Sequence, residues 1–263
     1  MGEFSAHAVE VDGYELRVAR AGAGAAVLVL GDVFGPGGIG GFHAALAKKH
    51  AVEAPTHPGF DATPTPEWLD NVSDLANFYL DYLKARASRG VHLVGLGVGG
   101  WIAADLATRD SSRLASLTLV NAAGLRVDGV AQADVFLGTE DEALRRLTHD
   151  PAAAERAIAE TLTPESEDTR LLNQQYAARL TWQPRLHDPH LRKWLRRIEA
   201  PTLVAWGAEN ALFPKAYGAA WRDLIPGAKL ETIAGCGHLA AFEKPAELAA
   251  IVSTFIAGQR VSA

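Results

Sequence analysis

The chain has 263 residues, and its 25 Lys and Arg against 31 Asp and Glu give a formal net charge of −6 at pH 7. Apolar residues make up 48% of the chain and charged residues 21%, which is ordinary for a folded globular protein and excludes a disordered one. The acidic balance and the absence of a long Lys/Arg run argue against a nucleic-acid partner.

The predicted elements begin with two strands, 6–11 and 14–20, joined at Asp12-Gly13, a dipeptide typical of a tight hairpin turn. Short apolar runs typical of strands buried on both faces follow at 25–30, 51–54, 91–96, 114–120, 201–206 and 229–233. Helical patterns alternate with them at 42–49, 68–89, 101–108, 217–224 and 246–256, with Pro66 suited to a helix start. This order predicts an α/β fold, with a mostly parallel eight-stranded sheet and helices on both faces.

One long stretch breaks the alternation. From about residue 125 to 198 no buried-strand run occurs, and helical patterns lie at 140–147, 151–161, 170–180 and 190–198. We expect residues 125–198 to form a helical cap over one edge of the sheet. The core domain would then consist of residues 1–124 and 199–263.

Cysteine usage and the chain's start bear on location and partners. The single cysteine, Cys236, excludes an intramolecular disulfide, and no Cys/His spacing is typical of a zinc site. The first residues are acidic and lack the apolar segment of a signal peptide, and the longest apolar run, 94–104, is too short for a membrane span. We therefore expect a cytoplasmic protein with no metal, cofactor or membrane partner, whose partner is a small molecule.

The glycines after the strand at 91–96 allow two interpretations. Gly95, Gly97 and Gly100 fit the dinucleotide fingerprint G-x-G-x-x-G, but the next strand ends at Asn121 and not at an acidic ribose ligand. The same residues fit the nucleophile elbow G-x-S-x-G, a strained strand-to-helix turn. On that interpretation Gly97 stands at the nucleophile position and offers no side chain to attack a substrate.

Residues 25–258 resemble a bacterial α/β-hydrolase of the epoxide-hydrolase/ester-hydrolase-like superfamily with a helical cap. The resemblance rests on the glycine elbow and on the order and spacing of four further segments: 27–32, 57–60, 201–207 with Pro214, and Gly235-Cys236-Gly237-His238 followed by Phe242-Glu243-Lys244-Pro245. It implies the α/β-hydrolase fold.

The resemblance also implies a degenerate catalytic triad. The family's serine falls on Gly97, its acid on Asn210 and its histidine on His238, so only the histidine is kept. The oxyanion loop, which usually begins His-Gly, reads Gly31-Asp32 here, and the oxyanion positions fall on Val33 and Val98. Hydrolysis through an acyl-serine at Gly97 is chemically impossible.

His238 and Asp32 are the candidate catalytic residues. A neutral imidazole at His238 can act as a general base near pH 7, with Glu209 or Asp32 replacing the acid that Asn210 cannot supply. A carboxylate at Asp32 would repel negative charge developing at an oxyanion site and would disfavour ester hydrolysis, but it could take a proton or hold a cation. The alternatives are a relic histidine held by hydrogen bonds and a solvated loop aspartate.

The other candidates are apolar. Catalysis by Cys236 with His238 is one interpretation, and packing is the usual role of a free cysteine. An apolar pocket under the cap is expected, with core packing as the alternative for each member. Its lining candidates are Phe34, Trp101, Phe136, Trp182, Phe213 and Leu239.

The sequence leaves three functions open. The first is a non-serine enzyme in which His238 acts as general base on water, a C–H or an O–H of a small, largely apolar substrate. The second is a pseudoenzyme that binds a small molecule or a partner without turnover. The third is a hydrolase with relocated catalytic residues, and the absent nucleophile makes it the least favoured.

Overall fold

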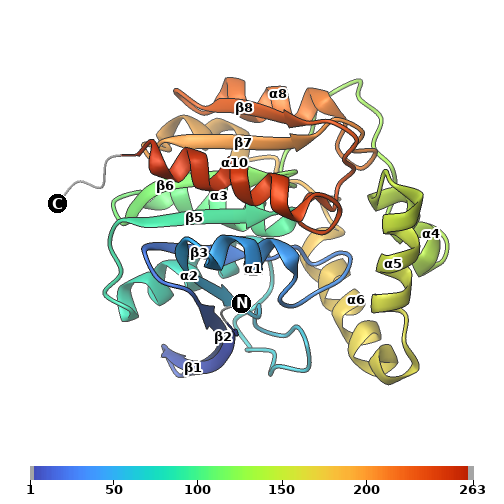
Figure 1. The fold of residues 1–263 in the computed structure, drawn as a ribbon, viewed down its shortest axis with the longest axis horizontal. Helices are drawn as coiled ribbons and strands as arrows, with labels where there is room; N and C mark the ends of the chain where they lie inside the picture. Colours follow the sequence, from blue (N-terminus) through green and yellow to red (C-terminus); the bar gives the residue numbers. More distant parts are fainter. Residues whose placement is uncertain (1–2, 260–263) are drawn as a thin grey trace.

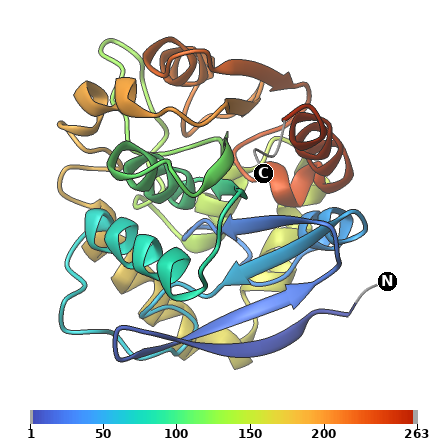
Figure 2. The same cartoon turned by 90° about the vertical axis from the view of Figure 1, so that its left-hand side faces the viewer.

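The computed structural model describes residues 3–259 and contains one mixed sheet of eight strands in the order β1-β2-β4-β3-β5-β6-β7-β8 (Figures 1 and 2). β1 pairs antiparallel with β2, and β2 antiparallel with β4, whereas all other neighbouring strands run parallel. The strands are β1 Ser5–Val11, β2 Tyr14–Ala21, β3 Ala25–Leu30, β4 His50–Pro55, β5 Val91–Leu96, β6 Leu114–Val120, β7 Thr202–Gly207 and β8 Lys229–Ile233. The predicted mostly parallel eight-stranded sheet is therefore confirmed.

Helices cover both faces of this sheet, as its buried apolar strands require. One face carries α1 (Gly41–Ala47) and α10 (Pro245–Ala257), whose apolar side chains form one core with β3, β4 and β5. The other face carries α2 (Val72–Ala85), α3 (Val98–Arg109) and α8 (Lys215–Leu224), which pack into the larger core. Figure 2 shows the two helical layers on either side of the sheet.

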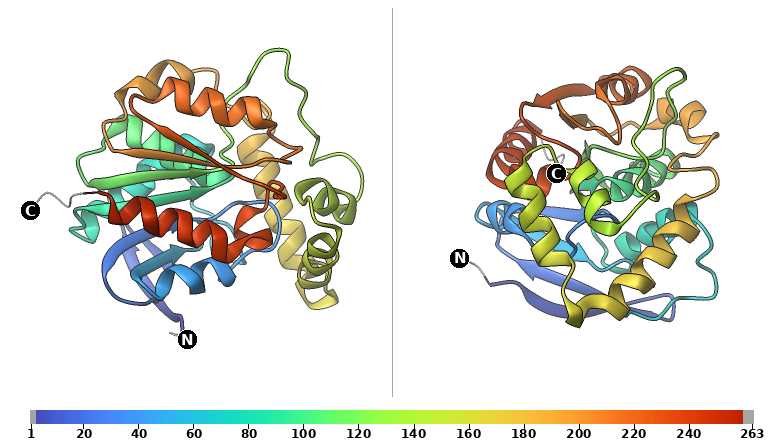
Figure 3. Two further views of the ribbon diagram at one scale, coloured as in Figure 1. Left: turned by 45° about the horizontal axis from the view of Figure 1, so that its top comes forward. Right: turned by 90° about the vertical axis from the view of Figure 1, so that its right-hand side faces the viewer.

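The segment between β6 and β7 is helical, and we use the name cap for residues 125–198. In Figures 1 and 3 the cap helices α4, α5 and α6 lie beyond the carboxyl ends of the parallel strands, on the side where the loops after β3 and β5 emerge. The cap elements are α4 Glu140–Leu147, α5 Pro151–Thr161, η1 Pro164–Ser166, α6 Glu167–Thr181, α7 Leu191–Trp194 and η2 Leu195–Arg197. The division of the chain into two domains stays a prediction.

Several predicted boundaries were wrong for local reasons. The helix expected at 68–89 is shorter, because Asn71 Oδ1 accepts the Asp74 N–H at 3.1 Å and caps the first turn, while Ala87 has φ of 49°. Pro66 therefore does not start it. The helix expected at 190–198 is broken into α7 and η2, and α9 (Ala240–Glu243) was not predicted.

Within residues 3–259, none of the helices combines the length and the apolar character that crossing a membrane requires. The expectation that the chain starts without a signal peptide rests partly on Met1 and Gly2, which lie outside the described residues.

Candidate active site

The turn between β5 and α3 has the backbone of a nucleophile elbow. Gly97 adopts φ of 52° and ψ of −115°, in the left-handed range of φ that side chains rarely adopt. The next element starts at once, with α3 beginning at Val98. The structure thus has the strained strand-to-helix turn that the glycine pattern predicts.

Asp32, in the loop after β3, places its carboxylate at the N-terminus of α3. Asp32 Oδ1 accepts the Val98 N–H at 3.0 Å and the Val33 N–H at 2.8 Å. These are the two positions at which the sequence places the oxyanion donors, so the carboxylate occupies both. A carboxylate at the first N–H group of α3 argues against the dinucleotide interpretation, because a pyrophosphate at this helix terminus would meet a group of like charge.

The carboxylate also fills the space that a side chain at residue 97 would need. A Cβ built on Gly97 would lie 2.1 Å from both Cγ and Oδ2 of Asp32. Real Cβ atoms do not approach other atoms so closely. Asp32 in this position and any side chain at residue 97 therefore exclude each other. Residue 97 thus favours glycine for two reasons, its positive φ and the lack of space for a Cβ.

His238 meets the same carboxylate. Its Nε2 lies 2.9 Å from Asp32 Oδ2, and the side chains of His238 and Asp32 are 1% and 11% exposed. The backbone is held from the cap, since the N–H groups of His238 and Leu239 donate to the Leu147 carbonyl at 2.8 and 3.1 Å. The loop of Asp32, the elbow and the turn of His238 thus converge on one point.

The rear of the His238 ring faces an amide. Asn210 Nδ2 lies 3.3 Å from His238 Nδ1, and Asn210 Oδ1 accepts the Phe213 N–H at 3.0 Å. Glu209, the other candidate to orient the histidine, instead accepts the Cys236 N–H at 3.0 Å. The imidazole therefore has a carboxylate in front and an amide behind, the reverse of a Ser-His-Asp triad.

Two further buried polar residues support this site; the sequence interpretation gave His57 a structural capping role in its turn and gave Asn121 no role in the site. Asn121, at the end of β6, donates from Nδ2 to the His238 carbonyl at 2.7 Å and accepts the Gly207 N–H at 2.8 Å. His57 Nε2 lies 3.0 Å from the Gly31 carbonyl, and its Nδ1 lies 2.7 Å from the Tyr79 hydroxyl. Burial lowers the pKa of His57, which keeps it neutral. A polar residue directly after a buried strand was the available signal for Asn121.

Cys236 is buried, and desolvation raises its pKa to about 12. Its Sγ lies 3.6 Å from the Gly237 carbonyl. A thiol in this state is not a nucleophile at neutral pH, and the geometry favours the packing role.

A cavity of about 1410 Å³ opens above the pair and extends beneath the cap. Asp32, Gly97 and His238 line its floor, and its apolar walls include three of the expected pocket residues, Phe34, Phe136 and Leu239. The lining contributed by the cap also includes charged side chains, among them Arg156, Glu160 and Arg170.

Three other residues expected in the pocket do not line this cavity. Trp101 is 5% exposed and packs against Gly124, where an added Cβ would lie 2.7 Å from its Cγ. Phe213 is fully buried behind the ring of His238, at 5.5 Å between centroids. Trp182 is 49% exposed, and its ring packs under the guanidinium of Arg185 at 4.3 Å.

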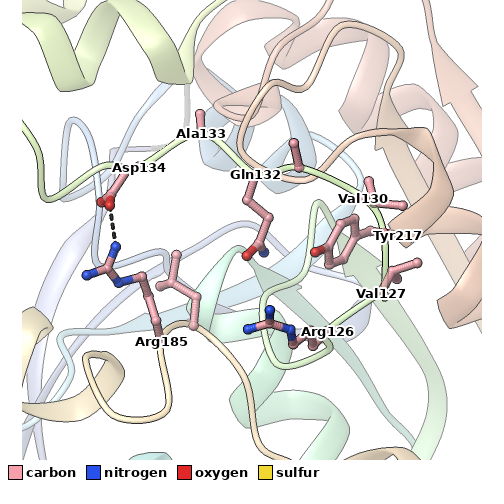
Figure 4. Close-up of a pocket in the computed structure, with 11 residues that line it drawn as sticks. Arg126, Val127, Val130, Gln132, Ala133, Asp134, Arg185 and Tyr217 are labelled. Atoms are coloured by element: carbon pink, nitrogen blue, oxygen red, sulfur yellow. Dashed lines mark hydrogen bonds and ion pairs between the residues drawn. The ribbon is translucent and has the colours of Figure 1, made fainter.

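A second, smaller hollow of about 380 Å³ lies between the start of the cap and α8 (Figure 4). Arg126, Gln132 and Tyr217 line it, and Arg185 forms an ion pair with Asp134 at its edge. It shares no lining residue with the larger cavity above the Asp32–His238 pair. Within residues 3–259, no group of three or more His, Cys, Asp or Glu is arranged to hold a metal ion.

The chain belongs to the α/β-hydrolase family, because the sequence model of that family matches residues 22–251. It is 29% identical over 276 residues to a 2-hydroxy-6-oxononadienedioate/2-hydroxy-6-oxononatrienedioate hydrolase of Burkholderia vietnamiensis, covering 93% of this chain and 92% of that protein. It is 26% identical over 240 residues to a 2-hydroxymuconate semialdehyde hydrolase of a Pseudomonas species, covering 81% and 78%.

Solved structures support the same fold. A 2-hydroxy-6-oxo-6-phenylhexa-2,4-dienoate hydrolase from a Rhodococcus species superposes with a TM-score of 0.77 at 18% identity, covering 98% of this chain and 100% of that one. At this identity the likeness concerns the fold alone. The expected α/β-hydrolase fold is confirmed.

Proposed function

We propose that this protein is a non-serine enzyme of the α/β-hydrolase family, in which the Asp32–His238 pair transfers a proton of a small, largely apolar molecule bound beneath the cap. The contact of 2.9 Å between Asp32 Oδ2 and His238 Nε2 on the cavity floor carries this proposal. A carboxylate and an imidazole within hydrogen-bond distance, at the base of a large cavity, are suited to acid–base catalysis.

The state of the oxyanion site supports proton transfer over acyl transfer. Asp32 Oδ1 already accepts both N–H groups that would stabilise a tetrahedral oxyanion, and its charge would repel one. The named substrates of the relatives, such as 2-hydroxymuconate semialdehyde, carry a carbonyl and a hydroxyl on an unsaturated chain. Molecules of that kind offer protons that a carboxylate can remove.

The proposal is tested by deuterium exchange. Small ketones, aldehydes and enols with apolar chains are incubated with the protein in D2O, and deuterium incorporation is followed by NMR. Asp32→Asn is expected to slow the exchange by about 100-fold or more, the usual contribution of a general base. Asp134→Asn is the matched control, because Asp134 lies at the edge of the smaller hollow and not on the cavity floor.

Exchange that persists in Asp32→Asn, or strong hydrolysis of p-nitrophenyl esters by the unmodified protein, would overturn the proposal.

A second candidate is a binding module, and one observation favours it. Asp32 occupies the oxyanion donors in the way that a bound anion would, so the site is closed to the family's usual intermediate. If the protein is a binding module, compounds that raise its melting temperature by binding are expected to show neither deuterium exchange nor turnover with the unmodified protein.

A further inference from the structure

The orientation of the Asn210 carboxamide is fixed by the backbone. Its Oδ1 accepts the Phe213 N–H at 3.0 Å, so its Nδ2 is the group that faces His238 Nδ1 at 3.3 Å. An amide nitrogen donates hydrogen bonds and accepts none. His238 Nδ1 must therefore present a lone pair, and in a neutral imidazole the proton then sits on Nε2.

The front of the ring leads to the same tautomer. His238 Nε2 faces Asp32 Oδ2 at 2.9 Å, and an ionised carboxylate only accepts. Its other oxygen, Oδ1, accepts two backbone N–H groups, so the whole carboxyl group acts as a hydrogen-bond acceptor. Both neighbours of the ring thus require Nε2–H and a bare Nδ1.

We infer that Asn210 is a positioning residue that fixes His238 as a hydrogen-bond donor, so that Asp32, and not His238, is the proton acceptor of the site. The role of Asp32 as proton acceptor rests on the proposed function. It replaces His238, the general base expected from the sequence, by Asp32. The exposures agree with it, since the His238 side chain is 1% exposed and the Asp32 side chain 11%. A substrate in the cavity reaches the carboxylate first.

The assignment narrows the substrate to a molecule with a removable proton beside a carbonyl group. Asp32 Oδ2 takes the proton from the carbon, the C–H electron pair forms a C=C bond, and the carbonyl oxygen gains the negative charge. His238 Nε2–H can donate a hydrogen bond to that oxygen without losing its proton. Return of the proton from Asp32 to carbon completes the exchange, and no oxidant or reductant is needed.

The test is the tautomer of His238 in the unmodified protein at pH 8, measured by two-bond ¹H–¹⁵N correlation NMR, with His238→Gln to assign the signals. Nδ1 is expected at the unprotonated and Nε2 at the protonated position. His57 is an internal reference: its Nε2 lies 3.0 Å from the Gly31 carbonyl, which only accepts, so it must be the same tautomer. A proton on Nδ1 of His238, with or without one on Nε2, would overturn the inference.

Asn210→Asp and Asn210→Leu extend the test. A carboxylate at position 210 accepts only, so the Nδ1 signal of His238 is expected to move to the protonated position. With a leucine at 210, Asp32 is the neighbour that still selects the tautomer, so Nδ1 is expected to stay unprotonated. A Nδ1 signal that stays unprotonated in a folded Asn210→Asp variant counts against Asn210 as the cause. If the tautomer is as expected and no compound exchanges deuterium, the proposed function fails while the assignment of His238 stands.

Discussion

Asp32 and Gly97 are one arrangement and not two separate departures from the family's pattern. The carboxylate occupies the volume above the elbow that any side chain at residue 97 would need. The sequence predicted the strand-to-helix turn at Gly97 and singled out Asp32. It could not predict that the Asp32 carboxylate binds the Val98 N–H and fills the space above Gly97, because that depends on the χ angles of one side chain reaching a helix 66 residues away.

Gly97→Ser is expected to destabilise the protein by about 1–3 kcal/mol, since it adds overpacking against Asp32 to a strained φ. In an Asp32→Ala background the overpacking is gone, and the same substitution should cost about 1 kcal/mol less. Chemical denaturation of the unmodified protein, Gly97→Ser, Asp32→Ala and the double variant measures this coupling free energy. Additive effects would show that the carboxylate and the elbow side chain do not compete for space.

Cys236 is expected to be inert in the folded protein, because burial raises its pKa to about 12. A thiol reagent at pH 8 should modify the native protein only slowly, and the denatured protein at once. Since Cys236 is the chain's one cysteine, the reaction reports a single site. Rapid modification of the native protein would contradict the buried position.

At the scale of elements, the cap is joined to the turn that carries His238. Glu243 Oε1 accepts the N–H groups of His149 and Asp150 at 2.6 and 3.0 Å, and its Oε2 accepts the Gly237 N–H at 2.7 Å. One carboxylate thus fixes the α4–α5 connection against the loop before α9. The sequence predicted α4 and α5, which flank this connection, but not these hydrogen bonds, since 94 residues separate Glu243 from His149.

Glu243→Ala should cost about 1–3 kcal/mol, because it leaves three backbone N–H groups without their charged acceptor. Glu247→Ala is the matched control; it removes an exposed glutamate of α10 and should stay within about 0.5 kcal/mol. Urea denaturation measures both. Equal stabilities of the two variants would mean that the carboxylate does not hold the cap connection.

Element boundaries show where sequence patterns stop being informative. The central strands β5, β6 and β7 were predicted closely, because residues buried on both faces leave continuous apolar runs. The strand at 229–233 is present, but its expected burial on both faces is wrong, because β8 lies at the edge of the sheet with most of its residues exposed. The helix expected at 68–89 was predicted too long, because the apolar spacing continues on the N-terminal side of Asn71. Asn71 is the N-cap residue of α2, and its side-chain hydrogen bond decides where the helix starts. Local hydrogen bonds set such limits, and periodicity does not record them.

At the scale of the whole molecule, buried neutral histidines make stability depend on pH. Burial lowers the pKa of His43 from 6.5 to about 4 and also lowers the pKa of His57 and His92. The unfolded chain therefore takes up protons at a higher pH than the folded protein does. This stability is fully present above pH 6.5 and is lost as the pH falls toward 4.

For His43 alone, the loss between pH 6.5 and 4 is expected to be on the order of 3 kcal/mol, at about 1.4 kcal/mol per pH unit. His43→Gln keeps an acceptor for the Gly40 N–H and should flatten the profile in that range. His149→Gln, which replaces an exposed histidine, should keep the profile of the unmodified protein. Denaturation at several pH values measures the free energy of unfolding of the three proteins. Parallel pH profiles for His43→Gln and the unmodified protein would show that burial of His43 does not cause the loss.

The mutual exclusion of Asp32 and a side chain at residue 97 also limits how the sequence can change. Serine at 97 alone meets the carboxylate, and loss of the carboxylate alone empties the oxyanion donors without restoring a nucleophile. Residues 32 and 97 are therefore free to change only together, and a side chain at 97 requires a smaller residue, or another rotamer, at 32.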